Sequence, residues 1–471
     1  MLLNAINRLF RLRAFPLALQ FVTLGGFIVV IALGMSANTE DPSFAKVLRN
    51  TNVANLIVWS YWWPLIILSA IFLGRVWCTV CPMELLTSLA TKMGLKRQPP
   101  AFLRSGWVMT AAYVVILFVG IQTLSIHRIP FRMALYLLAL ASIALVSGLL
   151  FRRNTFCASI CPVGHILGIY ARLAPVGWGV QDETTCSKCA DKSCVSNKNT
   201  DAFLGRSCGV GLYPANIDDN SDCILCGQCL KACNSNGVSV HGRPNPGWLR
   251  RPWFKDLLDL KPLTGPQAAF VFIVSGFVIY EVFTEWGLTK QWLLWLPMTL
   301  DEVLGATGHW THGLIKSLTL FVGLPALIWL LPYGLFRFMG GRLPLRDYAL
   351  RFGIAFIPIM AAAHAIKALL KMTSRIPYWQ YVVADPIGAE TAHRILDNTT
   401  VLSALPAWRD PVITVVSLLL MTGAIVLSWV IVRKLNTQYV AHSRWRSVSL
   451  YLIPGFFGGA FFAMLTTWRA L

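Results

Sequence analysis

The chain has 471 residues, of which 56% are apolar and only 13% are charged. A soluble domain usually carries about 25% charged residues, so this composition, with a mean hydropathy of +0.59, excludes a soluble enzyme with one oversized core. Lys and Arg number 41 against 21 Asp and Glu, which gives a net charge of +20. In a membrane protein such an excess reflects basic residues kept on the cytoplasmic side, so it requires no nucleic-acid partner.

Nine segments are long and apolar enough to cross a membrane, since a helix needs about 20 apolar residues to span the hydrocarbon core. The first has a basic leader with Arg8, Arg11 and Arg13, but its apolar run is too long for a cleaved secretion signal. We therefore expect it to remain as an anchor. The nine segments lie at about residues 15–35, 56–74, 105–124, 132–150, 267–286, 314–336, 349–370, 412–432 and 447–468.

The distribution of charge predicts the sidedness of these spans. With the N-terminus in the cytoplasm and nine crossings, Lys and Arg concentrate on the inner side, while Asp and Glu divide almost evenly. This skew of basic residues alone is what the positive-inside rule requires. It predicts a multi-pass protein of a cell inner membrane with a cytoplasmic N-terminus and a periplasmic C-terminus. Because the basic residues occur at span ends rather than on one patch, we expect no nucleic-acid binding.

All twelve cysteines lie between Cys78 and Cys233, and the strongest pattern among them is CILCGQCLKAC. Its spacing, C-x2-C-x2-C-x3-C, is that of bacterial ferredoxins, in which three thiolates hold one iron–sulfur cluster and the fourth reaches a neighbouring cluster. A tight, glycine-containing loop at this spacing can wrap a cubane and direct backbone amides at its sulfurs. The pattern therefore predicts cluster ligands at Cys223, Cys226, Cys229 and Cys233.

Four cysteines upstream have the spacing C-x2-C-x4-C-x13-C and suggest a degenerate copy of the same half. Together the two halves predict a module with two [4Fe-4S] clusters on the cytoplasmic side. Structural zinc is less favoured because its cysteine pairs are separated by a longer gap, and disulfides are not expected in a reducing compartment. By the exchange rule, one cluster takes Cys186, Cys189, Cys194 and Cys233, and the other takes Cys208, Cys223, Cys226 and Cys229.

The remaining cysteines form two similar pairs, in GRVWCTVCPMELL after the second span and in RRNTFCASICPVGHILG after the fourth. This similarity suggests an internal duplication of a two-span unit. Because Pro suits the first turn of a helix, we expect each pair in a turn between a span and a surface helix, where the helix start lowers the thiolate pKa. A third iron–sulfur cluster, a redox-active dithiol, a copper site and simple packing all remain open for Cys78, Cys81, Cys157 and Cys161.

These patterns predict an all-α polytopic membrane protein of about nine transmembrane helices with an inserted ferredoxin-like α+β module. We expect a four-span membrane region with the first cysteine pair over residues 1–150, and a cytoplasmic insert with the second pair and both clusters over 151–262. A five-span membrane region then follows over 263–471.

The chain resembles the membrane-bound polyferredoxins of the NapH and NosR type, which accompany periplasmic nitrate and nitrous-oxide reductases. The resemblance rests on GR-x2-C…CP after one span, FC-x3-CP after another and the ferredoxin run, within about residues 56–240. It implies transfer of electrons between the quinone pool and a periplasmic system, and a related group assists copper-enzyme assembly. Here the first pair is C-x2-CP where the family typically shows C-x3-CP, and Asn234 rather than Pro follows the run.

In the last five spans, ionisable residues are the candidates for a functional site because charge inside a membrane is costly. His364, Lys367 and Lys371 are spaced to fall near one helical face and could donate protons to a quinone carbonyl. In the simpler alternative, the lysines snorkel to the outer interface while His364 packs. His309, His312 and His393 lie on the outer side and could ligate a haem or a metal, or simply be exposed loop histidines. Without any C-x-x-C-H, no c-type haem is expected.

We find no nucleotide-binding loop and no nucleophile or metalloprotease motif, so we predict no catalytic residue. The sequence instead predicts an electron carrier or oxidoreductase subunit that relays single electrons between cytoplasmic-side clusters and the quinone pool or a partner reductase. An alternative is an assembly factor that reduces or delivers copper, with the two cysteine pairs as its working thiols. A transporter or sensor regulated by a cluster would need more buried polar residues at mid-membrane.

Overall fold

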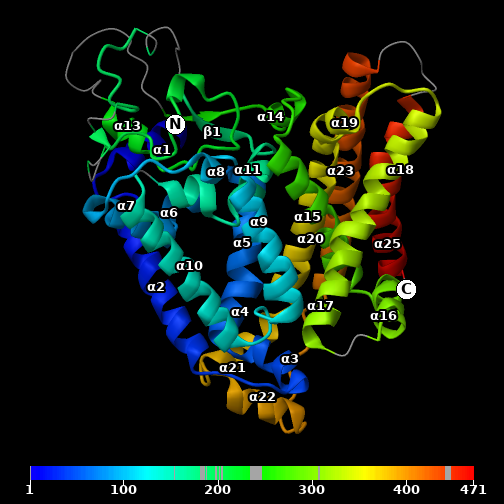
Figure 1. Cartoon of the computed structure of the whole chain (residues 1–471). Coiled ribbons are helices and arrows are strands. Elements are labelled where there is room, and N and C mark those ends of the chain that lie inside the picture. Colours follow the sequence, from blue (N-terminus) through cyan, green and yellow to red (C-terminus); the bar gives the residue numbers. More distant parts are fainter. Residues whose placement is uncertain are drawn as a thin grey trace. The chain divides into compact units, whose positions relative to one another are not determined.

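The computed structural model describes residues 2–152, 154–180, 186, 188–196, 199–200, 202, 205–233, 247–305, 308–440 and 447–470. The chain divides into two compact units, each assembled from separated stretches of sequence (Figure 1). Unit 1 comprises Met1–Ala32, Ser69–Ala112 and Ala134–Asp256, and it contains all twelve cysteines. Unit 2 comprises Leu33–Leu68, Tyr113–Met133 and Leu257–Leu471.

The apolar helices agree with the predicted spans, with one correction. Within the described part of the chain, eight are long and apolar enough to cross a membrane: Leu17–Met35, Val53–Leu73, Pro130–Leu150, Gly265–Phe283, His309–Phe338, Leu345–Val382, Arg409–Tyr439 and Ser449–Arg469. The ninth expected span, at 105–124, is a shorter apolar helix, Trp107–Thr123. Its second half is π-helical, which locally widens the turns of the helix.

Unit 1 is built from helices and one pair of strands. Its helical elements are α1 (Leu2–Arg11), α2 (Leu17–Met35), α6 (Trp77–Val80), α7 (Pro82–Met93), α8 (Ala101–Arg104), α9 (Trp107–Val115), α10 (Pro130–Leu150), η3 (Phe156–Ile160), α11 (Gly164–Ala171), η5 (Pro214–Asn216), α13 (Gln228–Ala232) and α14 (Lys255–Leu258). Strands β1 (Val176–Gly179) and β2 (Gly247–Arg250) pair antiparallel, with Trp178 opposite Trp248.

An aromatic cluster holds the N-terminal helix of unit 1 against the strand pair. The Phe10 ring on α1 lies 5.1 Å from the ring of Trp178 and 5.7 Å from that of Trp248, and all three side chains are buried. The Lys231 ammonium at the end of α13 donates to the carbonyl of Leu12, 2.9 Å away. Helix α1 therefore covers the segment that carries the ferredoxin-type cysteines.

Helices α7 and α10 of unit 1 pack closely because the contact position is a glycine. A Cβ on Gly148 of α10 would lie 2.6 Å from the carbonyl oxygen of Thr87 and 2.7 Å from the Cβ of Ala90, both on α7. Small residues allow such approach between membrane helices. This contact fixes α7, which begins directly after the first cysteine pair, against the span that precedes the second pair.

Unit 2 is entirely helical among its described residues. Its elements are α3 (Pro42–Thr51), α4 (Val53–Leu56), η1 (Ile57–Trp62), α5 (Trp63–Leu73), η2 (Ile116–Thr123), α15 (Gly265–Phe283), α16 (Gly287–Val303), α17 (His309–Leu318), η6 (Thr319–Gly323), α18 (Leu324–Phe338), α19 (Leu345–Phe352), η7 (Gly353–Phe356), α20 (Ile357–Ser374), η8 (Ile376–Tyr378), α21 (Trp379–Val382), α22 (Ala389–Leu396), α23 (Arg409–Tyr439), η9 (Ser449–Tyr451), η10 (Ile453–Gly458) and α25 (Gly459–Ala470).

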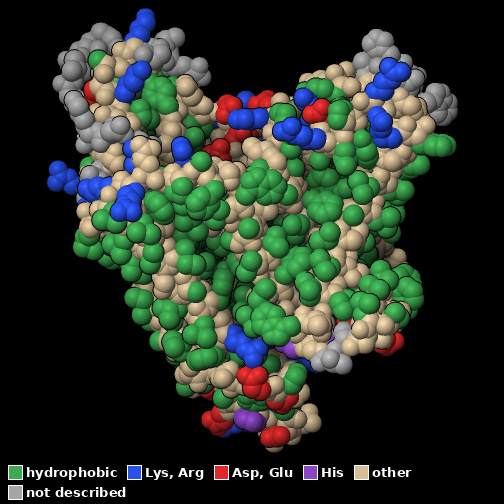
Figure 2. Space-filling view, viewed as in Figure 1, with side chains coloured by type: hydrophobic (Ala, Val, Ile, Leu, Met, Phe, Trp, Pro, Cys, Tyr) green, Lys and Arg blue, Asp and Glu red, His purple; other side chains and the backbone are tan. Residues whose placement is uncertain are grey.

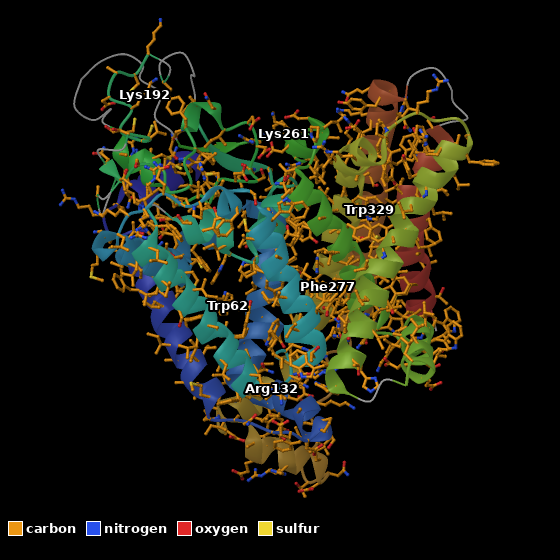
Figure 3. The ribbon with its side chains drawn as sticks, viewed as in Figure 1. Trp62, Arg132, Lys192, Lys261, Phe277 and Trp329 are labelled. Atoms are coloured by element: carbon orange, nitrogen blue, oxygen red, sulfur yellow. The ribbon has the colours of Figure 1, made fainter. Side chains whose placement is uncertain are left out.

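Helix α20 is the central helix of unit 2, packed between α15 and α23. Most of its residues are buried, and small side chains such as Ala363 and Ala365 let its neighbours approach. Figure 3 shows Phe277 of α15 and Trp329 of α18 among the helices of this unit. The Trp329 ring stacks on Phe356 at 4.4 Å, and its indole N–H donates to the Ser275 hydroxyl at 3.2 Å. The buried Trp329 side chain thus has both a stacking and a hydrogen-bond partner within the unit.

The outer faces of the unit 2 helices carry large apolar side chains. Trp292 and Trp295 on α16 are exposed, as are Leu327 on α18 and Leu419 on α23. In Figure 2 hydrophobic side chains cover most of the visible face of these helices. Apolar patches this extensive mark a membrane surface in a folded chain, which agrees with the spans predicted from hydropathy.

Candidate metal centres

The ferredoxin-type run turns back on itself through two left-handed residues. Leu225 has φ +52° and Gly227 has φ +70°, so the backbone reverses twice between Cys223 and Cys229. Gly227 is required because a Cβ at this position would collide with the Phe10 ring. The backbone N–H groups of Leu225 and Gln228 bond to Cys223 and Cys226 respectively and lower their pKa. The sequence pattern predicts amides directed at the sulfurs of a cubane, and these two N–H groups bond to cysteine sulfurs instead.

Cys208 meets this run from a separate loop. The four cysteines Cys208, Cys223, Cys226 and Cys229 line one cavity with about 350 Å³ of space free of protein atoms, part of it open to solvent. They also interact electrostatically with one another. The Trp178 indole N–H donates to the Cys229 Sγ at 2.6 Å, and the Leu212 N–H donates to the Cys208 Sγ at 3.3 Å.

The electrostatics of this cavity fit a metal cluster. Burial raises the pKa of Cys223 and of Cys226 to about 12, and it raises the pKa of Cys229 well above the ordinary thiol value. Four clustered thiols, of which Cys223 and Cys229 are buried, are stable as thiolates only where a positive centre compensates their charge. A coordinated metal deprotonates its thiol ligands. The donor set, the cavity and the inward N–H groups therefore suit a [4Fe-4S] cluster.

A second set of thiols forms around Cys194. Burial raises the pKa of Cys194 to about 12, and its further causes are the charges of Cys233, Cys186 and Cys189. The Tyr213 phenol interacts with the same four cysteines, and its hydroxyl donates to the carbonyl of Cys186. The Cys208 N–H donates to the Cys194 carbonyl at 2.8 Å, so the two sets are joined by a direct backbone hydrogen bond.

The two membrane-edge pairs converge within unit 1. Cys78 lies on α6 and Cys81 directly before α7, whereas Cys157 lies in η3 and Cys161 directly after it. Beyond the effect of burial, the charges of Cys78 and Cys161 raise the pKa of Cys81. The charges of Cys161, Cys81 and Cys78 likewise raise the pKa of Cys157. Four thiols that are far apart in the sequence therefore share one electrostatic environment.

The cysteine before each Pro accepts two backbone hydrogen bonds from the start of the following helix. The N–H groups of Met83 and Glu84 bond to Cys81, and those of Val163 and Gly164 bond to Cys161. The predicted lowering of the thiolate pKa is nevertheless wrong, because burial outweighs these N–H groups and raises the pKa of Cys161 to about 11 and that of Cys81 further. The predicted surface location also fails for the second helix, since α11 is buried along most of its length.

Two buried arginines connect the thiol sets electrostatically. Arg75, the Arg of the GR motif, bonds to Cys78 and donates to the Ser221 carbonyl at 3.0 Å, beside the ferredoxin-type run. Arg206 forms a buried ion pair with Glu84 and interacts with both Cys226 and Cys157. Each arginine thus lies between the membrane-edge cysteines and the cavity that contains Cys208 and Cys226.

Glu84 is the centre of a buried polar network, and its side chain is 3% exposed. Besides Arg206, its carboxylate accepts from the Gln20 amide at 2.7 Å and from the Asn154 amide at 2.9 Å. Sequence reasoning missed this network, because Glu84 and Arg206 are 122 positions apart and no spacing links them. The only local signal was a lone acidic residue on the helix that follows a CP motif.

Comparison with known proteins identifies part of this site. The profile of a family described as a 4Fe-4S binding domain matches residues 55–100 and 133–181, the two stretches that carry the membrane-edge cysteine pairs. An uncharacterized protein of Methanocaldococcus jannaschii is 28% identical over 181 residues, which cover 37% of this chain and 67% of that protein. No solved structure matches the chain.

The protein is therefore a multi-pass membrane protein with a 4Fe-4S binding domain. This conclusion combines the domain match with the eight apolar helices of the described chain. Among the residues that the structure describes, no group of three or more His, Cys, Asp or Glu is gathered closely enough to hold a single metal ion. In a cubane the thiolates instead bind separate iron atoms.

The ionisable residues of the second half lie in unit 2. His364 on α20 is buried, with its ring 5.9 Å from that of Phe277. The Lys367 ammonium donates to the Glu281 carbonyl at 2.8 Å and pairs with the carboxylates of Glu281 and Glu285. Lys367 is thus bound within the chain rather than extended to the interface, and sequence reasoning missed its acidic partners at the end of α15.

The outer histidines of unit 2 have local partners among the described residues. His312 Nδ1 lies 2.9 Å from Asp301, a ring nitrogen of His309 bonds to the Thr123 carbonyl, and the His393 ring packs 4.5 Å from Phe44. The structure does not bring these three side chains together with one another.

Proposed function

We propose that the protein transfers single electrons between [4Fe-4S] clusters on the cytoplasmic side of a cell inner membrane and the quinone pool or a partner reductase. Each bound cluster supplies a centre that accepts and releases one electron. The resemblance of the cysteine motifs to polyferredoxins of the NapH and NosR type supports this function, as does the family match at residues 55–100 and 133–181.

The observation that carries the proposal is the separation of the ferredoxin-type cysteines into two sets of four. Cys194 interacts with Cys186, Cys189 and Cys233, whereas Cys229 interacts with Cys208, Cys223 and Cys226. Each set takes one member from the other half of the sequence pattern, as two-cluster ferredoxins do. The direct hydrogen bond from Cys208 to Cys194 supports a short path between two clusters.

The side chains of this protein would adjust the reduction potential of the clusters and limit water around them, rather than perform chemistry themselves. Trp178 donates to the Cys229 sulfur and Leu212 to the Cys208 sulfur, which stabilises negative charge there. The buried cations Arg75 and Arg206 stabilise thiolate charge between the sets. Phe10 excludes water from the Gly227 turn.

For the four membrane-edge cysteines we propose a third [4Fe-4S] cluster. The family match contains both pairs and is described as 4Fe-4S binding, and the four thiols interact mutually. Arg75 and Arg206 each interact with this set and with the cavity set, so an electron path between the two would pass beside a cation. A copper-delivering assembly factor would use the same four thiols for transfer instead of electron relay.

Anaerobic purification with iron and sulfide analysis tests this function. About eight irons per chain are expected for two clusters and about twelve for three, with four for each cluster. A broad absorbance near 400 nm that is lost in air, with paramagnetic signals after reduction, should accompany them. Stoichiometric zinc without iron would contradict the proposal.

The membrane-edge cysteines separate the two functions. In Cys78→Ser combined with Cys157→Ser, electron relay predicts that electron delivery fails while the client enzyme still acquires its metal. An assembly role predicts the opposite, with loss of metal from the client and intact ferredoxin-type clusters. Labelling of single cysteines introduced at the two membrane sides tests the proposed cytoplasmic N-terminus and periplasmic C-terminus.

A further inference from the structure

Unit 2, which contains no cysteine, holds a second concentration of charge, on half-buried side chains. Six cationic side chains interact electrostatically there, and we call them the cationic cluster: Arg49, Arg128, Lys316, Lys367, Lys371 and Arg375. They come from several separate segments, which include the end of α3, the loop before α10, α17, α20 and the turn after α20. The fold of unit 2 therefore gathers them at one place.

The interactions within the cluster are mutual. Lys371 interacts with the Glu281 carboxylate and, beyond it, with the cations Lys367, Arg49 and Arg375. His127 interacts with Arg128, Lys371, Arg49 and Lys316, so its ring lies among four of the six cations. Like charges at such positions repel one another unless an anion lies between them.

The chain compensates only part of this positive charge. Among the described residues, the carboxylates that interact with the cluster are those of Glu281 and Glu285, and both are engaged by Lys367. Lys316 donates to the Tyr280 hydroxyl at 3.2 Å, which is a neutral partner. Burial and the charges of Arg375 and Arg128 together lower the pKa of Arg49 to about 10, against the opposite effect of Glu285. Two carboxylates against six cations leave an excess of positive charge.

The cluster also contains buried N–H donors that have no hydrogen-bond acceptor among the described residues. Arg128 Nε donates to His127 Nε2 at 3.1 Å, so the neutral His127 ring carries its proton on Nδ1. His127 Nδ1, Arg49 Nε and Arg375 Nε are all buried without a hydrogen-bond partner among the described residues. Buried donors are normally satisfied, so unused donors beside excess positive charge indicate an acceptor with negative charge.

We propose that the cationic cluster binds a phosphate-class anion, either the phosphate of a lipid headgroup or free phosphate, with Arg49, Arg375 and His127 as donors. Guanidinium groups match the geometry of phosphate oxygens, and several negative charges on one group balance several cations. A neutral quinone would leave the positive excess uncompensated.

The position of the cluster relative to the spans suits headgroup depth. Arg49 precedes the span that begins at Val53, and Lys371 and Arg375 lie near the end of the span Leu345–Val382. Arg and Lys side chains at this depth can contact the phosphate groups of lipids, because guanidinium and ammonium groups bind phosphate oxygens. A free phosphate would use the same donors from the aqueous side.

Thermal unfolding of the full-length cluster-loaded protein tests the site. Wild type in phosphate-free detergent is titrated with inorganic phosphate, and a second sample is compared in phosphatidylglycerol and phosphatidylcholine nanodiscs. We expect stabilisation by at least one anionic probe, at least tenfold weaker binding in Arg49→Gln and Lys371→Met, and wild-type binding in Arg394→Gln. Arg394 is a matched control, since its exposed side chain pairs with Glu390 on α22.

Each outcome decides the proposal. Stabilisation by inorganic phosphate supports a free anion, and stabilisation by phosphatidylglycerol alone supports a lipid headgroup. No response of wild type to either probe, or equal weakening in Arg394→Gln, overturns the site. Arg49→Lys keeps the charge and should bind within about threefold of wild type, which covers the case that Arg49→Gln fails to fold. Iron content unchanged in every variant separates this result from any failure of the electron-transfer function.

Discussion

The buried charges of the two units are compensated differently. In unit 1 the buried arginines face carboxylates or thiols of the chain: Arg206 pairs with Glu84, Arg251 lies 2.9 Å from Asp256, and Arg172 lies 3.8 Å from Asp219. In unit 2 the six cations of the cationic cluster share two carboxylates. A charge that is paired within the chain stabilises the fold, whereas an unpaired one destabilises it unless a ligand balances it. Removal of a charged group should therefore lower the free energy of unfolding in unit 1, and leave it unchanged or raise it in the cationic cluster of unit 2.

The largest effect is expected at the ferredoxin-type cysteines. Cys229→Ser and Cys194→Ser should each remove one cluster, with the loss of about four irons per chain, because we propose that each set of four thiols holds a separate cluster. Iron and sulfide analysis after anaerobic purification measures this loss. Cys208→Ser should abolish the same paramagnetic signal as Cys229→Ser, and Cys233→Ser the same signal as Cys194→Ser. The proposed pairing is wrong if Cys208→Ser instead matches Cys194→Ser.

Loss of the Glu84 carboxylate in unit 1 should have the next largest effect. Glu84→Gln leaves Arg206 buried without its counter-charge, which should lower the free energy of unfolding by about 3–5 kcal/mol. The melting temperature of the loaded protein measures it. Glu40→Gln is the matched control, because Glu40 pairs with Arg132 at 2.9 Å but its side chain is 78% exposed. That exposed pair should contribute about 0–1 kcal/mol.

Removal of a cation in unit 2 should have the opposite sign. In phosphate-free detergent, Lys371→Met should leave the free energy of unfolding unchanged or raise it by about 1 kcal/mol, because it relieves repulsion within the cationic cluster. The same melting assay, run beside Glu84→Gln, gives the comparison directly. A clear loss of stability without any anion would show that the chain itself balances Lys371.

The smallest effect is expected from the hydrogen bond to sulfur. Trp178→Phe keeps an aromatic ring but removes the N–H that donates to Cys229, so the reduced cluster loses stabilisation and its midpoint potential should fall while the iron content stays constant. Potentiometric titration measures the shift. Trp248→Phe alters the same aromatic cluster, and it serves as the control for simple repacking. An equal shift in both variants would assign the effect to packing.

Much of the membrane architecture could be predicted from the sequence because each span is a local property of about 20 residues. Eight predicted spans correspond to long apolar helices, and the one at 105–124 proved shorter. Iron–sulfur binding could likewise be predicted from local cysteine spacing, and the family match at the membrane-edge pairs agrees with that prediction. Helix α7 begins at Pro82, as a Pro at the first turn predicts.

The rest of the site depends on contacts between distant segments. The pair Glu84–Arg206 and the contact of Glu281 with Lys367 join residues that no motif relates. The thiolate pKa of Cys161 was predicted in the wrong direction because it depends on burial, which local sequence does not report. The cationic cluster was missed for the same reason, since Arg49 and Arg375 are brought together only by the packing of unit 2.

Helix α1 has a consequence for how the protein is made. The Phe10 side chain on this helix packs against the Gly227 turn, so it contacts a segment that is synthesised more than two hundred residues later. The cover over the ferredoxin-type loop can therefore close only after the whole cysteine region has left the ribosome. The order of synthesis thus delays the packing of α1 until most of unit 1 has been made.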